Sequence, residues 1–239
     1  IDMHVHFRDP GREDEETIET GTRAAAAGGF TSVACMANTD PVADNSSIVE
    51  YIISKAKSGG VVNVFPIGGV TKGLKGEELA EMGKMKESGA VAFSDDGRFI
   101  MDSKVLRYAL EYAKQFDATI ISHCEDHNLS LNCHMNESYL STIMGINGCP
   151  AISEEIMIER DIALAKEYGK IHIAHVSTAG SVERIRRAKA KGIAVTCETA
   201  PHYFSLTENA VEGYNTNAKV NPPLRGEKDL ASVISGLKD

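Results

Sequence analysis

The chain opens on IDMHVHFR (residues 1–8), a stretch in which polar and apolar residues alternate. Alternation predicts a β-strand that carries Asp2, His4 and His6 on one face. Two imidazoles on one face of a strand lie roughly 7 Å apart at the backbone, close enough to bind one metal ion. A lone histidine here would more often be a hydrogen-bonded core residue, but the pair, followed at once by RDPG (residues 8–11), favours a metal site.

Short apolar runs that are typical of strands alternate with helical patterns along the whole chain. The expected strands span residues 1–6, 31–36, 61–67, 90–94, 118–124, 170–176 and 193–199. The expected helices span residues 17–27, 46–57, 77–87, 103–115, 153–168, 180–191 and 227–237, and Asn45 is the expected N-cap of the second. Strands that alternate with helices in this way indicate βαβ units and a parallel sheet.

The positions of polar residues distinguish a closed barrel from an open, doubly wound sheet. Such residues lie at or just beyond the C-terminal ends of five expected strands: His6, Asn38, Asp95 with Asp96, His123 and His175. In a barrel these ends surround one active site, whereas an open sheet gathers ligands only near its switch point. We therefore predict an α/β fold, a (β/α)8 TIM-type barrel.

Seven expected strands are one fewer than the usual barrel has. We expect residues 1–239 to form a single metal-dependent barrel domain that is incomplete at both ends, with the eighth strand beyond Asp239. The longest connection, from about residue 125 to residue 153, is a candidate lid or binding loop.

Charge and cysteine content limit the classes of partner and compartment. A net charge of −9 argues against nucleic acid or an anionic membrane as a partner. No apolar run approaches the roughly 20 residues that a membrane span needs. The five cysteines lack C-x-x-C spacing, so we expect neither a disulfide framework nor a cysteine zinc site, and a reducing compartment fits best.

Four histidines and a carboxylate form the candidate metal-binding set: His4, His6, His123, His175 and one residue of the Asp95-Asp96 pair. Imidazole and carboxylate ligands suit zinc or a similar cation, and two ions that share the carboxylate fit the ligand count better than one. Such a pair could activate a hydroxide and polarise a carbonyl. The chemistry expected is hydrolysis of an amide, imide or ester.

Two of these choices depend on local spacing. His172 and His175 are separated by an odd number of residues, so they lie on opposite faces of a strand, and His175 is nearer its C-terminal end. We therefore favour His175 as the ligand. Spacing leaves open which of Asp95 and Asp96 binds metal, and a plain Asp-Asp-Gly turn is the alternative.

Three further residues are candidates for substrate binding. Arg8 follows His6 closely and could bind a carboxylate through two hydrogen bonds, although a surface arginine is the alternative. Asn38 and Asn221 could hydrogen-bond a polar substrate, and each also suits an Asx turn before proline.

Taken together, these motifs resemble the dihydroorotases of the amidohydrolase superfamily, in particular the class I bacterial type. The matching stretches are DMHVHFRDPG (2–11), AAAGGFTSV (25–33), MANTDP (36–41), FSDDG (93–97), SHCED (122–126), HVST (175–178), ETAPHYF (198–204) and NPPLR (221–225). They follow the expected order over essentially the whole chain.

The resemblance implies a pair of zinc ions. His4 and His6 would hold one ion, and His123 and His175 the other. Asp96 would bridge the two.

The resemblance also implies substrate contacts and a reaction. Arg8 and Asn38 would bind the substrate carboxylate, Asn221 would contact the pyrimidine ring, and His6 would adjoin the substrate. The reaction would be the reversible conversion of N-carbamoyl-L-aspartate to L-dihydroorotate in cytoplasmic pyrimidine biosynthesis. The implied partners are a small-molecule substrate, further copies of the chain in a homo-oligomer, and aspartate transcarbamoylase.

Three departures from the family pattern stand out. The Asp-His-Ala-Pro-His motif, which supplies the general acid/base aspartate, is absent, so no proton-transfer residue is expected within this chain. The flanking β-sandwich is also absent. Ala37 stands where the family usually has proline.

Two alternative functions follow from the same residues. Hydantoinases, dihydropyrimidinases and allantoinases resemble the chain in the His-x-His strand, but they generally bridge their metals with a carboxylated lysine that residues 90–94 lack. A non-catalytic homologue that serves as an assembly scaffold would usually lose metal ligands, whereas every ligand expected within this chain is present.

Overall fold

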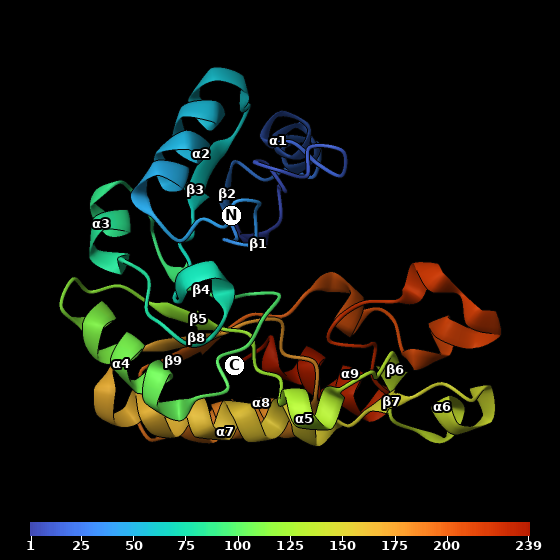
Figure 1. Cartoon of the computed structure of the whole chain (residues 1–239). Coiled ribbons are helices and arrows are strands. Elements are labelled where there is room, and N and C mark those ends of the chain that lie inside the picture. The colour runs from blue at the N-terminus through green and yellow to red at the C-terminus, as the bar shows by residue number, and fades with distance from the viewer. The chain divides into compact units, whose positions relative to one another are not determined.

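The computed structural model describes residues 1–239, which divide into two compact units, Ile1–Ser122 and His123–Asp239. Both units consist of helices and mainly parallel strands, so the predicted α/β class is confirmed (Figure 1). The prediction of one barrel domain over residues 1–239 stays a prediction. No helix is both long enough and apolar enough to cross a membrane.

The N-terminal unit consists of repeated strand–helix pairs. Its elements are β1 (Asp2–Val5), α1 (Ile18–Ala27), β2 (Ser32–Cys35), α2 (Ser46–Gly59), β3 (Asn63–Pro66), the 3-10 helix η1 (Lys72–Leu74), α3 (Met82–Glu87), β4 (Phe93–Ser94), α4 (Ser103–Lys114) and β5 (Ile120–Ser122). Strands β1, β2 and β3 pair in parallel, as do β4 and β5, and a parallel bridge joins Gly68 to Phe93. The strands of this unit thus follow chain order, and their C-terminal ends carry the candidate site residues.

Buried apolar side chains hold these strands to their helices. One core cluster contains Phe7, Ile18, Val33, Cys35, Ala37, Ala43, Ile52 and Leu74. Removal of such side chains from water is the main stabilising contribution to the unit. Asn45 is the N-cap of helix α2, and its side chain accepts hydrogen bonds from the Ser47 and Ile48 amides, as its position before the helical pattern predicts.

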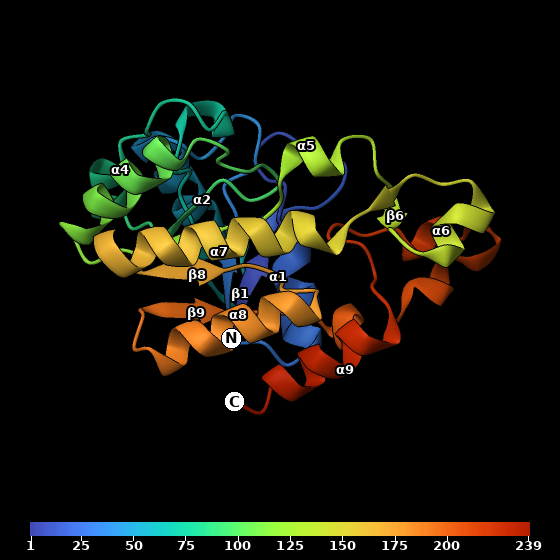
Figure 2. The same ribbon diagram turned by 90° about the horizontal axis from the view of Figure 1, so that it is seen from below.

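The C-terminal unit contains two helices packed on a strand pair. Its elements are α5 (His127–Ser130), β6 (Met135–Asn136), α6 (Tyr139–Met144), β7 (Gly148–Cys149), α7 (Ala151–Tyr168), β8 (Ile171–Ile173), α8 (Ala179–Ala190), β9 (Val195–Cys197), the 3-10 helices η2 (Pro201–Phe204), η3 (Glu208–Tyr214) and η4 (Thr216–Ala218), and α9 (Glu227–Gly236). Strands β8 and β9 pair in parallel, with α7 against β8 and α8 against β9 (Figure 2).

The long connection contains structure that the sequence patterns did not predict. Strands β6 and β7 pair in parallel, and a disulfide joins Cys133 to Cys149. The expectation that the cysteines form no disulfide is therefore wrong for this pair. Parallel pairing of β6 with β7 brings together two cysteines that are 16 residues apart in the sequence. No local sequence motif indicates that they form a disulfide.

All seven expected strands are confirmed, since β1 to β5, β8 and β9 each fall within the predicted ranges. One predicted helix, residues 77–87, begins only at Met82. Leu79 instead forms an antiparallel bridge with Thr71, and the Ala80 amide donates to the Val70 carbonyl. These contacts with residues 70 and 71 hold Leu79 and Ala80 outside the helix.

Candidate metal centre

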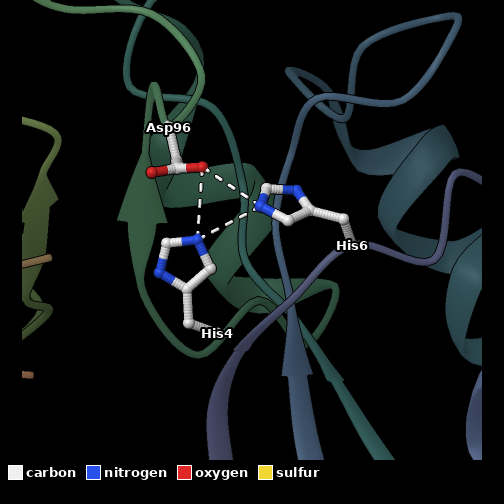
Figure 3. Close-up of side chains that lie close together, drawn as sticks. All are labelled: His4, His6 and Asp96. Atoms are coloured by element: carbon white, nitrogen blue, oxygen red, sulfur yellow. Dashed lines mark hydrogen bonds and ion pairs between the residues drawn. The ribbon is translucent and has the colours of Figure 1, made fainter. Parts of the chain in front are cut away.

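The N-terminal unit brings three of the predicted metal ligands together (Figure 3). The Nε2 atoms of His4 and His6 lie 3.2 Å apart. Oδ2 of Asp96 lies 3.2 Å from His4 Nε2 and 3.4 Å from His6 Nε2. Two nitrogens and one oxygen that converge in this way form a donor set that suits a zinc-like divalent cation.

The structure distinguishes the two adjacent aspartates. Asp95 accepts hydrogen bonds from the amides of Val70 and Thr71, at 2.8 and 3.0 Å, and from the Thr71 hydroxyl. Burial raises the pKa of Asp95, while these hydrogen bonds oppose the shift. Asp96, whose amide donates to Ser94 Oγ at 3.0 Å, turns toward the histidines instead. Asp95 therefore anchors the 70–71 loop, and Asp96 is the aspartate that faces His4 and His6.

A hydrogen bond to Asn38 orients His6. Nδ1 of His6 lies 2.8 Å from Asn38 Oδ1. Because a carbonyl oxygen only accepts, Nδ1 carries the proton and Nε2 presents its lone pair to the cluster. Burial lowers the pKa of His6, an effect that the Asp96 carboxylate opposes, so burial favours the neutral, metal-binding form. The structure thus places Asn38 beside the histidine–aspartate cluster, and its substrate role stays a prediction.

Arg8 lies on a tightly held loop next to His6. Its backbone adopts the left-handed conformation at φ +60°, which is rare for residues other than glycine. The next residue, Asp9, is buried and accepts hydrogen bonds from the Tyr51 hydroxyl at 3.0 Å and the Ile18 amide at 3.3 Å. Arg8 Nε lies 3.4 Å from Glu15 Oε2, so the Arg8 guanidinium already forms an ion pair with a carboxylate of the same loop.

The C-terminal unit brings together the other predicted histidine pair. His175 Nε2 lies 2.9 Å from His123 Nδ1. His175, like Arg8, has a left-handed backbone, at φ +36°, a kind of outlier that clusters at functional sites. His172 lies elsewhere, buried with Nδ1 2.8 Å from Thr196 Oγ1, and the choice of His175 as the ligand stays a prediction.

Glu125 contacts both His123 and Asn221. Its Oε2 lies 3.0 Å from His123 Nε2 and accepts a hydrogen bond from Asn221 Nδ2, also at 3.0 Å. Burial alone would raise the pKa of Glu125, but hydrogen bonds that include these two outweigh it and lower the pKa to about 2. The sequence patterns missed Glu125, although its position two residues after His123 placed it on the same face of an extended segment.

A buried arginine was also missed. Arg225 donates from Nη1 to Asn136 Oδ1 at 3.0 Å and to the Cys149 carbonyl at 2.8 Å. Its Nε donates to Ser177 Oγ, and Nη2 lies 3.9 Å from Glu154 Oε2. Arg225 thereby ties the 221–225 segment to β6, to β7 and to the turn after His175. Buried charges are stable only with such partners.

The chain matches known proteins along its length. A family model described as dihydro-orotase-like matches residues 1–181. The dihydroorotase of Ruminiclostridium cellulolyticum is 61% identical over 100% of this chain and 56% of its own length. The dihydroorotase of Geobacter sulfurreducens is 60% identical over the same shares. The chain thus spans about half the length of the curated relatives it matches.

Solved structures share the fold at lower identity. The L-hydantoinase (dihydropyrimidinase) of Arthrobacter aurescens is 23% identical with a TM-score of 0.82, over 97% of this chain and 53% of that chain. A D-hydantoinase from Bacillus sp. AR9 is 24% identical with a TM-score of 0.78, over 99% of this chain and 55% of that chain. These likenesses confirm the predicted α/β barrel fold class. By the family model and by identity to its relatives, the chain belongs to the dihydroorotase-like family.

Proposed function

We propose that this chain supplies the metal-binding part and much of the substrate-binding part of a zinc-dependent dihydroorotase. The enzyme would convert N-carbamoyl-L-aspartate reversibly to L-dihydroorotate in pyrimidine biosynthesis. The observation that carries the proposal is the convergence of His4, His6 and Asp96 within 3.4 Å of one another. Relatives named dihydroorotase at about 60% identity support the choice of reaction.

The proposed metal ligands fall into two sets. His4 and His6 would hold one zinc ion and His123 and His175 a second, and the proposal keeps Asp96 as the ligand shared by both. The paired imidazoles in each unit support this assignment. Bound zinc would supply Lewis acidity toward the amide carbonyl and would lower the pKa of a water molecule.

The chain's own residues would orient the ligands and bind the substrate. Asn38 holds His6 with Nε2 toward the cluster. Arg8 would exchange Glu15 for the substrate carboxylate, which can accept two parallel hydrogen bonds from the guanidinium. Asn221 would contact the pyrimidine ring, and His6 would adjoin the substrate. We assign proton transfer to an aspartate that residues 1–239 do not include.

The decisive experiment uses the full-length protein. Its zinc content would be measured by mass spectrometry, and kcat/KM would be compared for L-dihydroorotate, hydantoin, dihydrouracil and allantoin. We expect bound zinc and the highest kcat/KM with L-dihydroorotate. A preference for a substrate without a carboxylate would support a hydantoinase-type enzyme instead. A folded, zinc-loaded protein that turns over none of the four would support the scaffold alternative.

The proposal extends to the cellular setting. We propose a cytoplasmic enzyme that acts on a small molecule, forms a homo-oligomer and associates with aspartate transcarbamoylase. Light scattering on the full-length protein would give its oligomeric state, and a mixture with purified aspartate transcarbamoylase would test the complex. Elution of the two proteins as separate species at micromolar concentration would contradict the partnership.

A further inference from the structure

We propose that Glu125 is a positioning residue that fixes the tautomer and ring orientation of His123 and, through the same oxygen, the side chain of Asn221. The inference deepens the proposed function and rests on it. It would make one carboxylate the link between a metal ligand and a substrate contact.

The geometry at His123 supports the first half of the proposal. A neutral imidazole has one N–H donor and one lone-pair acceptor, and only the lone pair can bind a metal. Nε2 of His123 lies 3.0 Å from Glu125 Oε2, and an ionised carboxylate accepts hydrogen bonds but donates none. Nε2 therefore carries the proton. Nδ1, which lies 2.9 Å from His175 Nε2, is left as the nitrogen that can share a cation with His175.

The geometry at Asn221 supports the second half. Asn221 Nδ2 donates to the same Oε2 at 3.0 Å. The backbone that follows is held separately, because the Tyr203 hydroxyl donates to the Pro222 carbonyl at 2.7 Å and buried Arg225 anchors the end of the segment. Glu125 is thus the contact that orients the Asn221 side chain, while other residues hold its backbone.

Few substitutes for Glu125 satisfy both partners. Its side chain is only 19% exposed, so water replaces a lost contact poorly. Glutamine has nearly the same shape, and its amide oxygen can accept both hydrogen bonds, as Asn38 accepts from His6. That oxygen is neutral, however, so His123 and Asn221 both lose a charge-assisted hydrogen bond, and His123 becomes a weaker metal ligand. Partners of metal-bound histidines typically contribute 10- to 100-fold to metal affinity.

The test uses the full-length protein, Glu125→Gln and the matched control Glu137→Gln, which removes the same charge from an exposed glutamate of the same connection. Zinc affinities would be measured by chelator competition at neutral pH. We expect Glu125→Gln to weaken one zinc site by about 10- to 100-fold and Glu137→Gln to weaken neither. Equal zinc affinities in wild type and Glu125→Gln would overturn the proposal.

Two further measurements keep the test decisive if the variant folds poorly. Nitrogen-15 NMR of His123 in the metal-free wild-type protein should show the proton on Nε2, and a proton on Nδ1 would overturn the inference. The KM for L-dihydroorotate should rise in Glu125→Gln, and Asn221→Ala should add little to that rise in the double variant. Full additivity of the two changes would overturn the link to Asn221.

The outcomes separate this inference from the proposed function. A wild-type protein that binds zinc but does not turn over L-dihydroorotate would contradict the proposed reaction. The zinc affinities and the His123 tautomer would still decide the role of Glu125 at the metal ligand.

Discussion

At the scale of single residues, two neighbours of the same chemical type can differ in what they contact. Asp95 and Asp96 are adjacent carboxylates, yet one anchors backbone amides and the other faces two imidazoles. Their environments, rather than their identities, determine which one faces the histidines.

The two aspartates should therefore respond differently to removal of charge. Asp96→Asn should lower zinc content while changing thermal stability of the metal-free protein little. Asp95→Asn should destabilise the fold by about 1–3 kcal/mol, because the Val70 and Thr71 donors lose an ionised partner. Metal analysis and urea unfolding would check both. The reverse pattern, with zinc lost in Asp95→Asn alone, would exchange the two roles.

Arg8 belongs to the same scale. We expect Arg8→Ala in the full-length enzyme to reduce kcat/KM for L-dihydroorotate roughly 30- to 1,000-fold, about 2–4 kcal/mol, because a charge-assisted bidentate contact is lost. Zinc content should not change. Arg12→Ala is the matched control, since Arg12 is an exposed arginine of the same loop that also pairs with Glu15. Unchanged kinetics in Arg8→Ala would refute the carboxylate-binding role.

At the scale of secondary-structure elements, caps and cross-links determine where segments begin and how firmly they hold. The N-cap of helix α2, Asn45, accepts hydrogen bonds from two backbone amides of the first turn. The β6–β7 pair is held by a covalent bond and by Arg225. Both features can be tested without reference to catalysis.

Removal of the α2 cap should have a moderate effect. Asn45→Ala should lower the free energy of unfolding by about 1 kcal/mol, because the Ser47 and Ile48 amides lose their acceptor. Urea unfolding of the wild type and of Ser47→Ala, an exposed change in the same turn, provides the comparison. If Asn45→Ala unfolds at the same urea concentration as the wild type, the cap contributes nothing measurable.

Reduction of the disulfide should loosen the segment between Cys133 and Cys149. Loops of about 15 residues gain roughly 3 kcal/mol from closure, most of it through restriction of the unfolded segment. Hydrogen exchange should speed up at the His134 and Glu137 amides, which donate to Asn147 and Cys149 across the pair. Cys197→Ser under oxidising conditions is the control, since Cys197 is a free thiol. Identical exchange before and after reduction would argue that Arg225 alone holds the pair.

At the scale of the whole molecule, metal binding should contribute to stability as well as to activity. An ion that binds only the folded state stabilises it by about 4 kcal/mol at a thousand times its dissociation constant. Chelation should therefore lower the melting temperature of the full-length protein, and added zinc should restore it. The same treatment of Asp96→Asn should produce a smaller shift. If chelator leaves the melting temperature unchanged, the folded protein does not bind a stabilising metal ion.

Local patterns in the sequence determined a large part of this protein. Period-two alternation placed His4 and His6 on one face, and the order of strands and helices predicted the α/β barrel class that the solved relatives share. The sequence also predicted the Asn45 cap, because capping involves residues within a few positions of one another. These features depend on contacts between near neighbours in the chain.

Only the tertiary structure decided the choices that depend on distant partners. It turned Asp96 rather than Asp95 toward the histidines, joined Cys133 to Cys149, and placed Glu125 against Asn221, which lies 96 residues away in the sequence. A strand or a turn motif determines where a side chain leaves the backbone. What that side chain contacts depends on which remote segments pack beside it, and those contacts form only when the chain folds.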